Sequence, residues 1–176
     1  MKLLLLYILT ASLLFSTPAF SQVSKHNIEL GVGVSKGYNF PQATKTGWSG
    51  DAGYIVMLSL SNAITLNANF TIFRTGSASG FRYRNEFRTL SAGLRHRFSE
   101  KVYTSISLGG ASILKTSGSE TFAGIAQIRP GVLLPVKNNS IDISILLNQA
   151  TDKTGWFGIR IGTVLPVSKR RTFTKG

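Results

Sequence analysis

Eight stretches of the chain carry apolar side chains at every second position, which is the period of a β-strand with one apolar face. Turn-forming residues separate these stretches, and none of them shows the period of an amphipathic helix. The predicted strands cover residues 27–36, 49–60, 64–73, 89–98, 102–111, 125–134, 141–148 and 157–165. The pattern therefore predicts an all-β fold.

The connections between the predicted strands alternate in length. Short turns at 61–62, 99–101 and 137–139 alternate with longer links at 37–47, 75–86, 115–121 and 150–154. Outer-membrane barrels have short periplasmic turns and longer extracellular loops, and an even strand number leaves both ends of the barrel in the periplasm. We predict an eight-stranded antiparallel up-and-down transmembrane β-barrel over residues 22–167.

The two faces of the predicted strands differ in charge. None of the 38 positions on the apolar face is Lys, Arg, Asp or Glu, whereas seven of the 37 positions on the other face are charged. Alternation alone also fits a soluble barrel with an apolar interior. However, all nine lysines after residue 21 fall in connections, strand ends or termini, and a strand surface in water would carry several. We therefore expect the apolar face to contact lipid.

The charged face then points into the lumen. Its charged residues are Glu29, Asp51, Arg95, Arg97, Arg129, Asp142 and Arg160. Side chains fill an eight-stranded barrel, and unpaired charge in a dry interior is costly. We expect a hydrogen-bonded plug, in which Arg129 and Arg160 flank the strand that carries Asp142. A narrow solute pore is the alternative.

Aromatic residues cluster near the ends of the longer links. They are Tyr38, Phe40, Trp48, Phe73, Phe87, Phe122 and Trp156. Amphipathic rings favour the boundary between lipid and water, so we expect an aromatic girdle there, with ordinary loop packing as the alternative. Phe98 and Tyr103 are candidates for a second girdle at the other rim.

The chain begins with features of a secretory signal peptide. Lys2 precedes an apolar run over residues 3–15, and Pro18, Ala19 and Ser21 form a cleavage pattern. The apolar run is shorter than the ~20 residues that a spanning helix needs, which disfavours a membrane anchor. We expect a signal peptide over 1–21 and a basic tail over 168–176. The chain has no Cys, which excludes disulfides and thiolate chemistry.

Four predicted strands share the pattern polar-x-Gly-x-x-x-x-apolar. The two most similar copies are Arg129–Val136 and Arg160–Val167. In this pattern and in its ladder of strands the chain resembles the small OmpA/OmpX-type outer-membrane barrels. That resemblance implies an outer-membrane location, contact with outer-membrane lipid and lipopolysaccharide, and recognition by the outer-membrane insertion machinery. The insertion signal would comprise Arg160, Gly162, Leu165 and Val167.

The formal net charge is +13, and many of the cations lie in or beside the longer links. A basic rim suits lipopolysaccharide phosphates or another extracellular anionic ligand. The candidate contacts are Phe81, Arg82, Tyr83 and Arg84, because guanidinium and aromatic groups together bind anionic or flat partners. A solvated loop tip is the alternative. The expected location argues against nucleic-acid binding.

Sequence motifs for catalysis are sparse. His26 and His96 are the only histidines, and both fall near the predicted periplasmic rim without a Ser and an acid at suitable spacing. We expect no enzyme activity, no cofactor and no metal, and we retain a lipid A-modifying hydrolase as an alternative. The predicted function is a structural or surface-interaction role of an outer-membrane barrel.

Overall fold

The computed structural model describes residues 25–38, 46–76, 82–114 and 118–167, and eight strands fill most of these ranges. The strands are β1 (His26–Tyr38), β2 (Thr46–Met57), β3 (Asn62–Gly76), β4 (Arg82–Arg97), β5 (Val102–Leu114), β6 (Glu120–Val136), β7 (Asn139–Ala150) and β8 (Gly155–Pro166). No helix in the described ranges is long and apolar enough to cross a membrane. The predicted all-β fold is confirmed.

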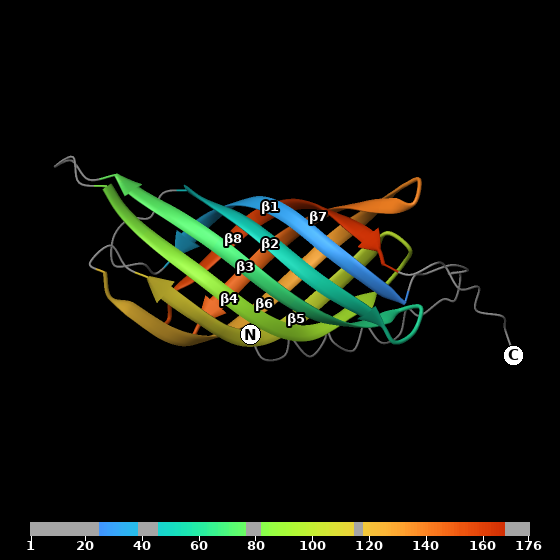
Figure 1. The fold of residues 1–176 in the computed structure, drawn as a ribbon, viewed down its shortest axis with the longest axis horizontal. Coiled ribbons are helices and arrows are strands. Elements are labelled where there is room, and N and C mark those ends of the chain that lie inside the picture. The colour runs from blue at the N-terminus through green and yellow to red at the C-terminus, as the bar shows by residue number, and fades with distance from the viewer. Residues whose placement is uncertain (1–24, 39–45, 77–81, 115–117, 168–176) are drawn as a thin grey trace, which may run out of the picture.

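The sheet closes on itself. Each strand pairs antiparallel with its neighbours in the sequence, and β1 also pairs with β8, which gives a closed barrel (Figure 1). The pairing at this closure runs from Asn27 opposite Pro166 to Tyr38 opposite Gly155. The start of β1 and the end of β8 therefore lie at the same end of the barrel. This is the predicted up-and-down order.

The two ends of the barrel differ in their connections. Residues 58–61, 98–101 and 137–138 join the strands at the end where β1 begins, which we name the turn end. The links at the opposite end, the loop end, are 39–45, 77–81, 115–119 and 151–154.

The second link at the loop end is shorter than the sequence pattern predicts. Arg74–Gly76 pair with Arg82–Arg84, which extends β3 and β4 beyond their predicted ends. Backbone hydrogen bonds hold such a ribbon together without an apolar face, so hydrophobic periodicity could not find it. The prediction of a loop over 75–86 is therefore wrong at both of its ends.

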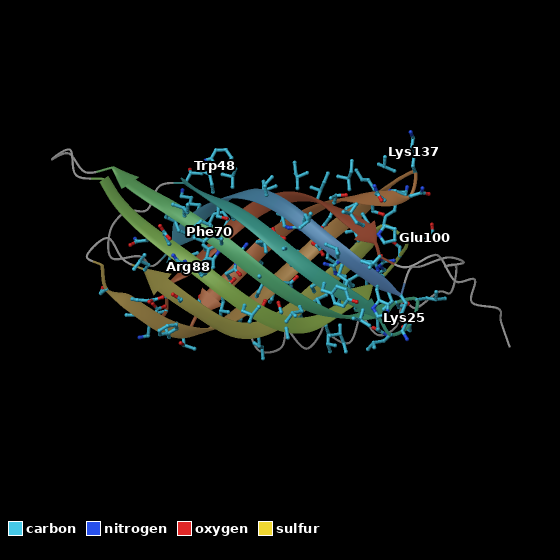
Figure 2. The ribbon with its side chains drawn as sticks, viewed as in Figure 1. Lys25, Trp48, Phe70, Arg88, Glu100 and Lys137 are labelled. Atoms are coloured by element: carbon cyan, nitrogen blue, oxygen red, sulfur yellow. The ribbon has the colours of Figure 1, made fainter. Side chains whose placement is uncertain are left out.

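The outer wall is apolar between the two ends. On β7 the alternate residues from Ile141 to Leu147 are exposed, while the residues between them are buried. In Figure 2, Lys25 and Lys137 lie at the turn end and Arg88 lies toward the loop end. The wall between them exposes the Leu, Ile and Val side chains that the sequence places on the lipid-facing side. A wall of this kind suits acyl chains, because a cation near the bilayer midplane costs about 2–4 kcal/mol.

Candidate functional site

The middle of the lumen is ionic. Six charged side chains from six strands meet there, each at most 6% exposed. We name them the lumen ion network: Glu29, Asp51, Arg95, Arg129, Asp142 and Arg160. Three guanidinium groups and three carboxylates make the network neutral in its formal charges. Pairing of this kind offsets the cost of removing each ion from water.

Glu29 on β1 is the shared acceptor of the network. Its carboxylate lies 2.6 Å from Arg95 Nη2, 2.9 Å from Arg129 Nη1 and 2.9 Å from Arg160 Nη1. These cations come from β4, β6 and β8, so one side chain joins β1 to three other strands. Charge-assisted hydrogen bonds across the lumen thus tie opposite walls together.

Arg160 on β8 is the corresponding shared donor. Its Nε lies 2.7 Å from Asp51 Oδ1, and its Nη1 lies 2.5 Å from Asp142 Oδ2. With Glu29, this guanidinium contacts one acid from each of β1, β2 and β7. The side chain is fully buried, so these carboxylates take the place of water around it.

Two glycines make the space that the Arg160 side chain occupies. Asp51, Gly31, Gly162 and Asp142 stand side by side in register on β2, β1, β8 and β7. A Cβ atom on Gly31 would lie 2.4 Å from the Arg160 guanidinium, and one on Gly162 would lie 2.8 Å from it. The guanidinium therefore lies over bare backbone between two acids, and a larger residue at either glycine would displace it.

The facing wall carries the other two arginines. Arg95, Ser105 and Arg129 are in register on β4, β5 and β6, and Arg95 Nε donates to Ser105 Oγ at 2.9 Å. Tyr103 lies beside them, with Arg95 4.2 Å above its ring and its hydroxyl donating to Asp142 at 2.7 Å. Tyr103 therefore links this wall to the acids opposite. Gly131 provides its space, because a Cβ there would lie 2.5 Å from the ring.

A layer of neutral polar side chains lies between the ion network and the loop end. Gln127 Nε2 donates to Asn148 Oδ1 at 2.9 Å, and Ser107 Oγ donates to Gln127 Oε1 at 3.2 Å. All three residues are buried. This layer adds hydrogen bonds between β5, β6 and β7 without adding charge.

Apolar clusters close both ends of the lumen. The loop-end cap comprises Phe73, Phe87, Ala111, Ile113, Ile125 and Trp156. The turn-end cap comprises Ile55, Met57, Ala63, Tyr103, Leu133 and Val164. In the loop-end cap the Phe87 and Trp156 rings have centroids 4.7 Å apart, and Phe73 packs edge-on against Phe87. The ion network is thus enclosed between two apolar layers.

The aromatic girdle prediction is wrong for four residues. Phe73, Phe87 and Trp156 are at most 1% exposed inside the loop-end cap, and Tyr103 is buried in the lumen. Their positions have inward parity along their strands, and the rings fill space there. Tyr38, Trp48, Phe98 and Phe122 do have outward parity, and Phe40 lies outside the described residues.

Arg97 and Arg129, both predicted to point into the lumen, differ in their ionic contacts. Arg97 is half-buried at the last position of β4, beyond the layer that holds the three carboxylates, and the ion pairs of the described residues do not include it. Arg129 pairs with Glu29 across the lumen instead of with Asp142 on the neighbouring strand β7. The position of Arg129 in the sequence predicts its depth in the lumen, but it does not predict the direction of its long side chain.

The candidate loop contacts occupy a different element from the one predicted. Arg82, Tyr83 and Arg84 belong to the β4 backbone and are paired with β3, so they extend the barrel wall instead of forming a loop tip. Phe81 and the side chains of these three residues lie outside the described part of the chain.

The proposed insertion signal lies on the closing strand. Arg160, Gly162 and Leu165 are in β8, and the Val167 N–H donates to the His26 carbonyl at 2.9 Å, one residue beyond the strand. Arg160 and Gly162 also belong to the middle of the lumen, as described above. Recognition of this segment by the insertion machinery stays a prediction.

Both histidines lie on the outer side at the turn end. His26 Nδ1 is 2.8 Å from the Tyr54 hydroxyl, and His96 Nδ1 is 2.8 Å from Asn62 Oδ1. Neither of these two hydrogen-bond partners is a serine or a carboxylate. Among the described residues there is also no group of three metal-ligating side chains.

The sequence of this chain matches no family model and no curated protein. Solved barrels do resemble its structure. Ail, the attachment invasion locus protein of Yersinia pestis, aligns with a TM-score of 0.55 at 16% identity, over 81% of this chain and 98% of Ail. Neisserial surface protein A aligns with a TM-score of 0.56 at 13% identity, over 81% of this chain and 97% of that protein.

A third similar structure is the N-terminal β-barrel domain of Pseudomonas aeruginosa OprF. It aligns with a TM-score of 0.51 at 13% identity, over 81% of this chain and 98% of the domain. The fold is that of an eight-stranded outer-membrane barrel. The outer-membrane localisation predicted from the sequence follows from this fold together with the apolar outer wall.

Proposed function

We propose that this chain is an outer-membrane barrel with a filled lumen, which acts as a structural or surface-interaction protein without catalysis. The observation that carries the proposal is the enclosure of a neutral ion network between two apolar caps. A solute that crossed the lumen would have to displace both caps and separate buried ion pairs. Breaking such pairs is costly, because each partner is then left charged and without water.

Planar-bilayer recording tests the closed lumen. The purified full-length protein is expected to give no stable open steps after insertion, in bilayers where a porin of known conductance does. Heat-modifiable migration on a denaturing gel verifies that the barrel is folded in the sample. Reproducible single-channel steps from folded protein would overturn the proposal in favour of a narrow pore.

Interaction with partners is assigned to the basic loop end. Cations at or near this end are Lys36, Arg74, Arg82, Arg84, Arg88 and Lys153, and the acids there are Glu86, Glu120 and Asp152. The excess of positive charge favours anionic partners. Ail, whose barrel has the same fold, has been solved in complex with the heparin analogue sucrose octasulfate, at 14% identity and a TM-score of 0.50. A polyanion is therefore the partner class proposed for this end.

Titration with sucrose octasulfate in lipid nanodiscs tests the loop end. The Arg82→Gln/Arg84→Gln double variant is expected to bind about tenfold more weakly, because it removes two charge-assisted contacts. The matched control is Lys101→Gln/Lys137→Gln, which removes the same charge at the turn end and should leave the affinity unchanged. Equal losses in both double variants would show that only net charge matters.

A further inference from the structure

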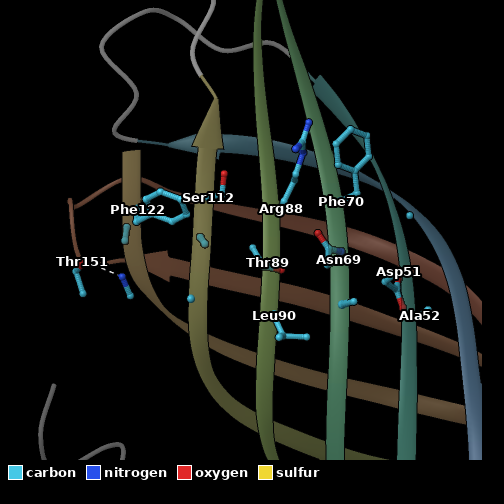
Figure 3. A pocket seen from close by; sticks show the side chains of 16 residues that line it. Asp51, Ala52, Asn69, Phe70, Arg88, Thr89, Leu90, Ser112, Phe122 and Thr151 are labelled. Atoms are coloured by element: carbon cyan, nitrogen blue, oxygen red, sulfur yellow. Dashed lines mark hydrogen bonds between the residues drawn. The ribbon is translucent and has the colours of Figure 1, made fainter. Parts of the chain in front are cut away.

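The outer wall has a hollow near the loop end, of 970 Å³, that extends across β2 to β6 (Figure 3). Two adjacent rows of outward residues line it. The row nearer the loop end, which we name the rim row, is Gly50, Phe70, Arg88, Ser112 and Phe122. The next row toward the turn end, the floor row, is Ala52, Ala68, Leu90, Gly110 and Gly124.

Missing side-chain volume creates the hollow. Four of the five floor-row residues are Gly or Ala, whereas the outward positions of β7 and much of β8 carry Ile, Leu or Phe. A Cβ atom built on Gly50 or Gly110 would meet nothing within 4 Å. The space is therefore open to the surroundings of the barrel, and its size falls in the ~300–1,000 Å³ range of ligand pockets.

The rim row adds a cation beside this apolar floor. The Arg88 side chain is 60% exposed, and its Nη2 is 3.4 Å from Glu86 Oε2, a long contact that uses one of its N–H donors. Figure 3 shows Arg88 and Phe70 on adjacent strands with their side chains directed toward the loop end. Phe122, 82% exposed, stands on β6 at the other side of the hollow.

Some polar groups next to the floor row already form hydrogen bonds within the protein. Ser112 Oγ donates to Glu120, and the Gly124 N–H donates to Thr151 Oγ1 at 3.1 Å. The acids Glu86 and Glu120 belong to the next row toward the loop end. The hollow thus combines an apolar floor with one exposed guanidinium, ion-paired to Glu86, at its upper edge, an arrangement that suits an amphiphile whose anionic head competes with Glu86 for Arg88.

We propose, resting on the outer-membrane function and the anionic partner class proposed above, that this hollow binds one phosphorylated glycolipid of the lipopolysaccharide kind, with an acyl chain on the floor row and a phosphate on Arg88. The loop end faces the cell exterior, so the hollow lies in the outer leaflet, where lipopolysaccharide is the phosphate-bearing lipid. Acyl chains of the surrounding membrane contact the whole outer wall. A lipid bound at this site differs from those lipids in its contact with Arg88, because a charge-assisted hydrogen bond to the phosphate holds the head group above the acyl chain.

Native mass spectrometry of the full chain, extracted from outer membranes in mild detergent, tests the proposal. The wild-type protein is expected to retain one lipid with the mass of a phosphorylated glycolipid. Gly110→Leu fills the floor without meeting another atom at its Cβ and should lower the retained fraction about tenfold. Arg88→Gln should lower it about tenfold as well, whereas Arg88→Lys should retain most of it.

Matched controls lie outside the hollow, on β1 and at the turn end. Val32→Leu adds volume to the outer wall, and Lys101→Gln removes an exposed cation at the turn end, and neither should change lipid retention. Gly110→Ala provides a milder floor variant if Gly110→Leu fails to insert. Unchanged retention in folded Gly110 and Arg88 variants would overturn the proposal. A retained phospholipid, or a dimer that disappears in the Gly110 variant, would overturn the assigned occupant.

Discussion

The middle of the lumen and its two ends fill the same narrow space by different means. In the middle, Glu29 and Arg160 each contact several partners of opposite charge at 2.5–2.9 Å. At the ends, aromatic and aliphatic side chains fill the space by volume. Ion pairs demand one geometry, whereas apolar packing tolerates changes of shape. The middle therefore specifies which strands face one another, and the ends keep water away from it.

The largest expected effect on stability comes from removing the ion pairs of Glu29, and it is compared with a small change of apolar volume on the same strand. Glu29→Gln leaves the Arg95, Arg129 and Arg160 guanidinium groups without their shared carboxylate and should lower the unfolding free energy by about 3–5 kcal/mol. Denaturant unfolding in lipid vesicles measures this change. Ile28→Val, on the lipid-facing side of the same strand, is the control and should have a much smaller effect. A Glu29→Gln variant as stable as the control would mean that the ion network does not stabilise the barrel.

A second prediction concerns the glycines beneath Arg160. Gly31→Ala places a methyl group 2.4 Å from the guanidinium and should destabilise the barrel by about 1–3 kcal/mol, because the ion pairs must shift. Gly50→Ala, whose added Cβ meets open space on the outer wall, should change stability by less than about 0.5 kcal/mol. The same vesicle unfolding assay compares the two variants. Equal effects would assign the loss to strand propensity instead of to the Arg160 contact.

The two caps are expected to respond alike to a small loss of volume. Ile113→Val in the loop-end cap and Ile55→Val in the turn-end cap should each cost about 0.5–1.5 kcal/mol, the usual loss for one buried methylene. Each variant is measured by denaturant titration beside the wild type. If only one variant is destabilised, then only that cap is packed tightly enough to seal the lumen.

The smallest expected effect is that of salt on the ion network. Buried pairs are screened far less than exposed ones, so the stability difference between wild type and Glu29→Gln should change by less than about 0.5 kcal/mol between about 0.1 and 1 M salt. Vesicle unfolding at the two salt concentrations provides the measurement. A difference that shrinks strongly at high salt would indicate that water and ions reach the lumen.

The recurrence of apolar residues at every second position predicts the fold and the direction of most side chains. It assigned Ile64 and Leu94 to the outside and Arg95 and Arg129 to the inside, where the structure places them. It also gives inward parity to Phe73, which the clustering of aromatic residues near the loop end instead assigns to a lipid-facing girdle. Periodicity was the better guide there, since parity fixes the face of a strand and composition does not.

The contacts inside the lumen could not be predicted from the sequence. Strand tilt and stagger decide which residues meet across a barrel, and a linear pattern does not contain them. Arg129 therefore meets Glu29 on β1 instead of Asp142 on the neighbouring β7. Gly31 carries one local signal of these contacts, because a glycine with inward parity next to inward charges indicates a large side chain close by.

Placement of Arg160 on the last strand couples charge neutralisation to closure of the barrel. Two of its three acidic partners, Glu29 and Asp51, come from β1 and β2, on the far side of the seam between β1 and β8. Before β1 and β8 pair, Asp142 is the one acidic partner among these three that lies on the same side of the seam as Arg160. A half-open sheet in the membrane would therefore hold a poorly compensated cation until the first and last strands pair.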